Sequence, residues 1–161
     1  MAKLFDMLKA QPAKAPIGDP QELQVKFKYW RKRTLIASMV GYAIFYFVRK
    51  NFSMAMPYFN QELGYSKTDL GMILFSFSII YGVGKFVNGA FADRANPRFF
   101  MAIGLLGSAI VNIFFGLSSS LLFFGVFWLF NAFFQSMGWP PCARLLTYWF
   151  SRKERGFWFG F

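Results

Sequence analysis

Four cationic side chains lie within or at the ends of long apolar stretches of this 161-residue sequence: Arg49, Lys50, Lys85 and Arg144. An ionisable group inside a bilayer costs about 2.5–3.5 kcal/mol on insertion scales, so each of these residues needs a partner. The apolar stretches contain no Asp or Glu that could serve. For Arg49 and Lys85 we therefore expect either a carboxylate from a further part of the protein or an anion that binds and leaves.

Polar side chains recur at helical spacing in three of these stretches. At about 100° per residue, each set falls on one face of a helix, so we expect three helices to line a shared aqueous cavity. Arg offers a planar fork of donors that suits phosphate, Lys a mobile charge, and Tyr a hydroxyl that can bond phosphate or sugar. The sets are Tyr42, Tyr46 and Arg49; Tyr81, Lys85 and Asn88; and Asn131, Gln135 and Trp139.

Other interpretations of these residues remain open at this point. A Tyr in a transmembrane helix also serves as a packing residue or as an interfacial anchor. Trp139 precedes Pro140 and Pro141 and could shape a kink instead. Lys50 lies about 100° around the helix from Arg49, so it could pair with another helix rather than with the same anion.

The elements that must hold these residues are predicted to be membrane-spanning helices. Hydrophobic residues make up 56% of the sequence, aromatic residues 22% and charged residues only 16%, a composition typical of membrane proteins. The apolar residues form runs that reach or approach the roughly 20 residues needed to span a bilayer. We therefore predict an all-α membrane protein with four complete helices at about 35–58, 70–92, 99–117 and 121–150, and a fifth from about 155.

Residues 1–34 differ in composition and are predicted to form a cytoplasmic tail. Residues 1–20 are rich in Pro and indicate a flexible segment, whereas QELQVKFKYWRKR at 21–33 indicates a short basic amphipathic helix on the membrane surface. Residues 35–161 are predicted to form a partial transmembrane domain. The fifth apolar run is six residues long at Phe161, so we expect the functional unit to be longer than this sequence.

Most cations outside the apolar runs gather on one predicted side of the membrane. Eight precede residue 35, two lie in the loop at 93–98 and three in the loop at 151–155, thirteen in all, whereas Lys67 stands alone on the opposite side. This bias places the N-terminus in the cytoplasm. It also means that the cationic ends of the helices lie beside membrane lipid. Because these cations are topology signals, the net charge of +11 is not taken to indicate a nucleic-acid partner.

The residue types that most catalytic sites need are scarce. The sequence has no histidine, one cysteine and no acid within the apolar runs. Phosphoryl hydrolysis or transfer requires a nucleophile with a base, a carboxylate pair or a metal cluster. We therefore expect no enzyme, no cofactor and no metal site, and we predict that Cys142 is a packed core thiol.

Five segments in order resemble one family of membrane carriers. These are GYAIFYFVRKNF, YGVGKF, FADRANPRFF, FFQSMGWPPCAR and WFSRKERG, and they look like the organophosphate:phosphate antiporter family of the major facilitator superfamily. The resemblance covers the chain from Tyr29 onward. Some segments are more similar to hexose-phosphate carriers and their sensor homologue, and others to glycerol-3-phosphate carriers.

The resemblance implies the N-terminal half of a major facilitator fold, in which two six-helix halves rock about a site near mid-membrane. It implies a monomeric inner-membrane transporter that exchanges an organophosphate, expected to be hexose 6-phosphate, for inorganic phosphate. A membrane sensor of sugar phosphate with a signalling partner, and a glycerol-3-phosphate or phosphoglycerate antiporter, are the alternatives. By position, the resemblance makes Arg49 and Lys85 the phosphate ligands and Tyr42, Tyr46, Tyr81 and Trp139 cavity residues.

The loop motif FADRANPR carries one further expectation. Asp93 ends the second predicted helix and could pair with Arg144 near the inner end of the fourth, as a gating or structural contact, with Arg94 beside it. The resemblance also implies that a second arginine and a histidine from later helices complete the site. We therefore expect that residues 1–161 alone do not transport.

Overall fold

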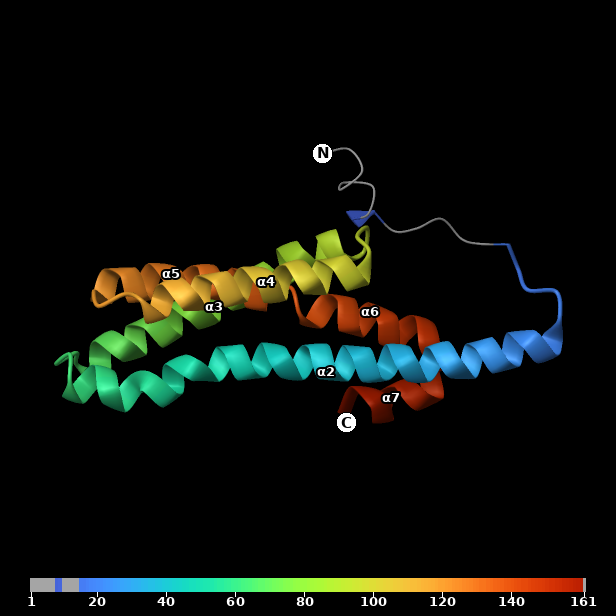
Figure 1. Cartoon of the computed structure of the whole chain (residues 1–161), viewed down its shortest axis with the longest axis horizontal. Helices are drawn as coiled ribbons and strands as arrows, with labels where there is room; N and C mark the ends of the chain where they lie inside the picture. Colours follow the sequence, from blue (N-terminus) through green and yellow to red (C-terminus); the bar gives the residue numbers. More distant parts are fainter. Residues whose placement is uncertain (1–7, 10–14, 161) are drawn as a thin grey trace.

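The computed structural model describes residues 8, 9 and 15–160, and its named elements are all helices. Figure 1 shows a long helix, α2, running the length of the molecule, with α3, α4 and α5 packed together at one end and α6 and α7 near its other half. The bounds are α2 Pro20–Gln61, α3 Lys67–Ala92, α4 Pro97–Gly116, α5 Leu121–Gln135, α6 Trp139–Trp149 and α7 Arg152–Gly160.

Helix α2 contains both the predicted surface helix at 21–33 and the predicted span at 35–58. Asp19 caps it by accepting a hydrogen bond from the backbone N–H of Gln21 at 2.9 Å, and Pro20 occupies the first turn, a position where its missing N–H is not needed. No Gly or Pro follows until Gly41. The chain therefore continues as one helix from residue 21 through residue 58. Most of the predicted flexible tail lies outside the described residues.

The second and third predicted helices match α3 and α4 to within three residues. Ser66 and Asp69 form a capping box at the start of α3, because each side chain bonds the other residue's backbone N–H. Asn96 caps α4 through the N–H of Arg98 at 3.1 Å, and Pro97 follows in its first turn. Local capping residues thus explain both starts.

The predicted fourth helix is two helices, α5 and α6. Pro140 and Pro141 have no N–H to donate to the carbonyls of Ser136 and Met137, so a regular helix cannot continue through this segment. The backbone instead closes short turns, with Gly138 N–H donating to Gln135 C=O at 3.3 Å, and α6 restarts with the prolines in its first turn. The predicted helix at 121–150 is thus divided at the position where the sequence left a proline kink open.

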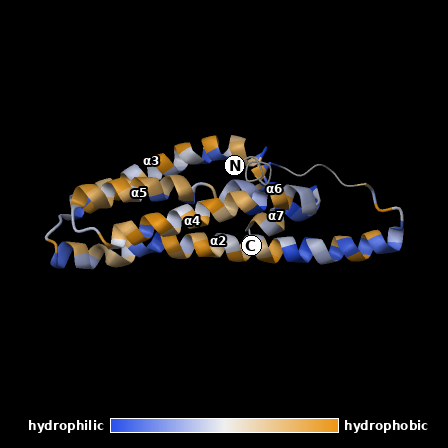
Figure 2. Ribbon diagram, turned by 45° about the horizontal axis from the view of Figure 1, so that its top comes forward, coloured by the Kyte–Doolittle hydropathy of each residue, from blue (hydrophilic) through white to orange (hydrophobic). Residues whose placement is uncertain are grey.

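Three segments of the described chain are long and apolar enough to cross a membrane: Lys67–Ala92, Pro97–Gly116 and Leu121–Trp149. Helix α2 is not among them by composition, and it carries the Arg49–Lys50 pair. Figure 2 shows apolar residues spread along the bundle and polar residues concentrated toward the N-terminal end of α2. The protein is a multi-pass helical membrane protein.

Aromatic side chains form the main core at the end of the bundle where α2 gives way to α3. Phe52, Phe77 and Trp128 pack there, with ring centroids 4.9 Å apart for Phe52–Trp128 and 5.3 Å for Phe77–Trp128. The most extensive helix contact joins α4 and α5. This core fixes α2, α3 and α5 beside one another directly next to Arg49.

Candidate functional site

Arg49 lies on the inward side of α2 among aromatic rings. Its guanidinium carbon is 4.3 Å from the ring centre of Tyr81, 5.1 Å from that of Tyr46 and 6.0 Å from that of Phe77. These distances are within cation–π range. The Nε and Nη2 atoms of Arg49 are buried and have no hydrogen-bond partner among the described residues. The guanidinium is therefore held by ring faces while two of its donor nitrogens remain available.

Lys85 contacts the same tyrosine from one turn further along α3. Its Nζ is 4.5 Å from the ring centre of Tyr81, so two cations from two helices share one ring. The apolar runs contain no carboxylate, and two adjacent cations repel each other. The missing negative charge is the main electrostatic feature of this part of the molecule.

A cavity of about 580 Å³ opens beside these cations. Tyr42 connects its walls, since its ring is 5.3 Å from the ring of Tyr46 and 5.3 Å from that of Trp139. The structure thus brings together all six residues assigned by the resemblance: Lys85, Tyr42, Tyr46 and Trp139 line the cavity, and Arg49 and Tyr81 adjoin it through ring contacts.

Several cavity residues were not anticipated from the sequence. Ser38 lies one turn before Tyr42 on α2, and Cys142 lies nearly one turn after Trp139 on α6. Extending the two helical stripes by one turn could have found both. Trp158 and Phe159 of α7 also line the cavity. Their segment is too short for its hydrophobic periodicity to predict which residues face a cavity. Cys142 is buried, which confirms the predicted packed thiol.

Asn131 and Gln135 do not line the cavity, which corrects the predicted third polar stripe. Both side chains are fully buried between α4 and α5. Ser108 donates to Asn131 Oδ1 at 2.5 Å, and Gln135 Nε2 donates to Ser108 Oγ at 2.9 Å. Interhelical hydrogen bonds of this kind join transmembrane helices, and they hold both side chains against α4, while Asn131 Nδ2 and Gln135 Oε1 have no partner among the described residues.

Asn88 also leaves the predicted cavity face. It is 2% exposed, and its amide donates to Ser136 Oγ at 2.6 Å across the α3–α5 contact. Gly84 makes this approach possible, because a Cβ there would lie 2.5 Å from Ser136 Oγ. Lys50 is exposed and is not part of the cavity lining. These two candidates are therefore outside the site that this structure presents.

Arg144 is satisfied by backbone and not by Asp93. Its Nη1 donates to the carbonyls of Ala92 at 2.6 Å and Ala95 at 2.9 Å, which lie where α3 ends and helical carbonyls lack partners. No ion pair within 4 Å joins Arg144 to Asp93, both of which are described residues. The predicted pair is wrong, and Asp93 and Arg94 are exposed.

The chemistry available at the site is recognition of an oxyanion. The described residues contain no group of three or more His, Cys, Asp or Glu side chains that could hold a metal ion. What the site offers is an Arg fork, a Lys ammonium and Tyr hydroxyls, all of which can donate hydrogen bonds to a phosphate. The aromatic walls offer apolar faces to an organic substituent.

The helical, multi-pass architecture and a cationic cavity between helices define a class of membrane carriers. Residues 38–161 match the family model described as Major Facilitator Superfamily. The chain belongs to this superfamily, and the match points to a transport protein rather than a catalyst.

Relatives in other organisms narrow the resemblance. A Probable hexose phosphate transport protein of Chlamydia trachomatis is 51% identical over 88% of this chain and 31% of that protein. The Membrane sensor protein UhpC of Escherichia coli is 49% identical over 96% of this chain and 35% of that protein. A Glycerol-3-phosphate transporter of Bacillus subtilis is 46% identical over 86% of this chain and 32% of that protein. The chain spans about a third of the length of these relatives, and they confirm the predicted family.

Proposed function

We propose that this chain is part of a secondary transporter that exchanges an organophosphate, with hexose 6-phosphate as its main substrate, for inorganic phosphate by alternating access. The observation that carries this proposal is the pair of cations on the ring of Tyr81, with no carboxylate in the apolar runs. Two donor nitrogens of Arg49 have no hydrogen-bond partner in the part of the chain that the structure describes. An anionic ligand would supply both the charge and the acceptors.

Charge balance gives a physical reason for exchange. An empty site with two unpaired cations resists reorientation across the membrane, because buried charge is costly. A site loaded with phosphate or an organophosphate is largely neutralised, so the loaded carrier reorients more readily. Exchange follows if only the loaded protein moves freely.

The walls of the cavity favour a sugar phosphate. Tyr42, Trp139 and Phe159 form a connected aromatic surface, with Trp139 and Phe159 ring centroids 5.8 Å apart. Such faces suit the C–H faces of a hexose ring better than a small glycerol backbone. The Chlamydia trachomatis relative is described as a hexose phosphate transport protein, which supports the same choice.

We further propose that the protein lies in the inner membrane as a monomer, with its N-terminus in the cytoplasm. The ends of α3, α4 and α6 alternate between the two ends of the bundle in Figure 1, and the cation-rich loops fall at one of them. On this proposal α2 supplies a further span despite its cations, α5 and α6 together form the fourth, and α7 begins a fifth.

The test uses the full-length protein in phosphate-loaded proteoliposomes. External glucose 6-phosphate, glycerol 3-phosphate and 3-phosphoglycerate are offered in turn, and the release of labelled phosphate is followed. We expect fastest exchange with glucose 6-phosphate, and a loss of about 10- to 150-fold in affinity for Arg49→Ala or Lys85→Ala, since each removes a charge-assisted hydrogen bond. Lys67→Ala, which removes an exposed lysine at the opposite end of α3, is the matched control.

Two results would overturn the assignment of the site. One is the absence of binding by the wild-type protein, and the other is binding that Arg49→Ala and Lys85→Ala leave unchanged. Preference for glycerol 3-phosphate would overturn only the choice of organic group.

A sensor is the second candidate function. The observation that favours it is the similarity to the Membrane sensor protein UhpC, which covers 96% of this chain and is nearly as high as that to the hexose phosphate carriers. A sensor needs the same anion site, so the geometry supports both. Binding of glucose 6-phosphate without counterflow of phosphate, in the assay above, would favour the sensor and a signalling partner.

A further inference from the structure

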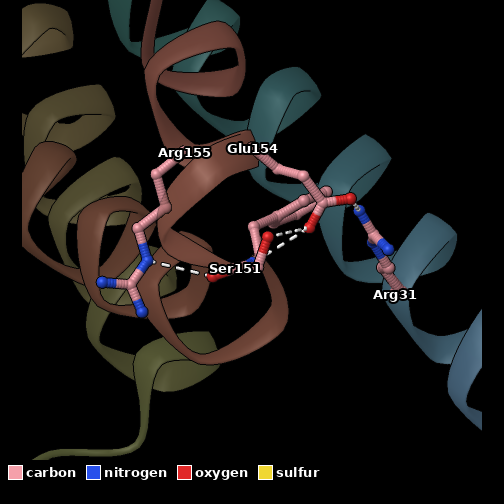
Figure 3. A network of polar contacts seen from close by, with 5 residues as sticks. Arg31, Ser151, Glu154 and Arg155 are labelled. Atoms are coloured by element: carbon pink, nitrogen blue, oxygen red, sulfur yellow. Dashed lines mark hydrogen bonds and ion pairs between the residues drawn. The ribbon is translucent and has the colours of Figure 1, made fainter.

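A second polar cluster lies outside the anion site and joins α2 to the start of α7 (Figure 3). Arg31 Nη2 donates to Glu154 Oε1 at 2.5 Å. The other carboxylate oxygen of Glu154 accepts from the backbone N–H of Ser151 at 3.0 Å and from its hydroxyl at 2.7 Å. Glu154 thus closes the first turn of α7 with one oxygen and holds α2 with the other.

Apolar and backbone contacts reinforce this junction. The guanidinium of Arg31 lies 4.4 Å from the ring centre of Phe150, and Phe27, one turn earlier on α2, lies 5.5 Å from the ring of Trp149. Arg155 donates back to the carbonyl of Phe150 at 2.9 Å. The cluster therefore fixes the bend between α6 and α7 and the position of α2 beside it.

The junction between Arg31 and Glu154 lies next to the cavity. Leu35, one turn after Arg31 on α2, lines the cavity, and so do Trp158 and Phe159, which follow Glu154 along α7. The ring of Phe159 contacts Trp139 at 5.8 Å. Any shift at the start of α7 moves this part of the cavity wall.

We propose that Arg31 and Glu154 are positioning residues that hold α7 against α2 and so keep Trp158 and Phe159 in the wall of the cavity. The contact does not touch Arg49 or Lys85. Its loss loosens the wall without removing a phosphate donor. The expected effect on substrate affinity rests on the proposed function, whereas the effect on access to the cavity does not.

Cys142 provides the readout, because it lines the cavity and is only 4% exposed. The full-length protein in membranes is treated with N-ethylmaleimide, and modification of the peptide containing Cys142 is followed by mass spectrometry. We expect Arg31→Gln and Glu154→Gln to speed labelling about two- to fivefold, the range for a partly exposed ion pair. Lys153→Gln, which neutralises an exposed neighbour of Glu154, is the control and should label as the wild type does.

The double variant makes the test specific to the pair. If the contact is the cause, Arg31→Gln adds nothing further in the Glu154→Gln background. Arg31→Lys keeps the charge and should restore most of the protection. In exchange assays the same variants should raise the KM for glucose 6-phosphate about two- to fivefold with little change in kcat.

Labelling at the wild-type rate in both single variants overturns the proposal, as does equal acceleration by Lys153→Gln or additive effects in the double variant. Failure of the proposed transport function would show differently. Arg49→Ala would then leave phosphate binding unchanged while the Arg31 and Glu154 variants still exposed Cys142.

Discussion

Two arginines within this bundle are stabilised in different ways. Arg144 Nη1 donates hydrogen bonds to the carbonyls of Ala92 and Ala95, which joins its guanidinium to the end of α3. Arg49 contacts the ring faces of Tyr46 and Tyr81 and keeps Nε and Nη2 free among the described residues. Ring faces stabilise the charge without occupying its donors. Nε and Nη2 of Arg49 can therefore donate to the anion proposed above, whereas Nη1 of Arg144 donates to the end of α3.

Replacing Arg49 by Lys separates charge from geometry. Arg49→Lys keeps the cation but removes the planar fork that can bond two phosphate oxygens at once. We expect affinity for inorganic phosphate to fall about 10- to 150-fold, as measured by equilibrium binding to the full-length protein. The melting temperature should stay near that of the wild type, because Nε and Nη2 make no hydrogen bond with any described residue. Unchanged affinity would show that only the charge matters.

Arg144 should show the opposite pattern. Arg144→Gln removes two charge-assisted hydrogen bonds to the end of α3 and should lower the free energy of unfolding by about 1–3 kcal/mol. Asp93→Asn, a change at the exposed neighbouring acid, should stay within about 0.5 kcal/mol. Thermal unfolding in detergent measures both. If Asp93→Asn lowered the free energy of unfolding strongly, and did so only while Arg144 was present, the two residues would form an ion pair after all, and the structural assignment would be wrong.

The contribution of Glu154 to stability is expected to depend on pH. Hydrogen bonds from Arg31 and Ser151 lower the pKa of its carboxyl from 4.5 to about 2. A lowered folded-state pKa means that its contribution to stability is complete above pH 4.5 and is lost as pH falls toward 2. The difference in melting temperature between wild type and Glu154→Gln should therefore be constant from pH 7 to about 5 and narrow below 4.5. A difference that changes between pH 7 and 5 would contradict this assignment.

At the scale of elements, the sequence predicts helix positions well where the signal is local. The apolar runs and the capping residues Ser66 and Asn96 set the starts of α3 and α4. The sequence predicted two helices, at 21–33 and 35–58, where the structure has the single helix α2, because a change from basic to apolar residues marks a change of environment and not a helix end. The break before Trp139 was predicted only as an alternative, since one proline pair can kink a helix or divide it.

Polar stripes predicted the cavity only in part, and the reason is geometric. Helical periodicity shows that Asn131 and Gln135 share one face of a helix. It does not show whether that face lines a cavity or packs against another helix. Ser108 on α4 supplies matching hydrogen bonds, and a serine in an apolar run gives no signal of its partner. The cations were predicted more securely, because a buried charge demands a partner wherever it lies, whereas a buried amide can be satisfied by any neighbouring helix.

Close helix packing gives a prediction for α4. A Cβ on Gly107 would lie 2.4–2.7 Å from ring atoms of Phe134 on α5, whereas a Cβ on Gly116 of the same helix would meet nothing within 4 Å. We expect Gly107→Ala to lower the free energy of unfolding by about 1–3 kcal/mol through overpacking. Gly116→Ala is the matched control and should not be destabilising. Equal melting temperatures for the two variants would show that the α4–α5 contact adapts freely.

At the scale of the whole molecule, charge and apolar surface divide the protein into zones. Large apolar side chains such as Phe47, Phe75, Phe86 and Leu106 are more than 60% exposed, which suits contact with lipid or with further helices of a longer protein. The hydropathy colouring in Figure 2 places polar residues mainly toward the ends of the bundle. This zoning is compatible with a membrane around the middle of the bundle, and the positive-inside rule then predicts which loops face each side.

The orientation of the bundle in that membrane can be tested with two matched substitutions. Lys67→Cys and Lys153→Cys each remove one exposed lysine, at the start of α3 and in α7 respectively. Lys67 stands at the end of the bundle where α2 finishes, and Lys153 lies beside the cation-rich loops that the positive-inside rule assigns to the cytoplasm. In intact cells, a membrane-impermeant maleimide should label Lys67→Cys, and it should reach Lys153→Cys only after permeabilisation. The reverse pattern would place the N-terminus outside and the junction of Arg31 with Glu154 on the outer face. Labelling of both sites in intact cells would show that the segment from α3 to α7 does not cross the membrane as proposed.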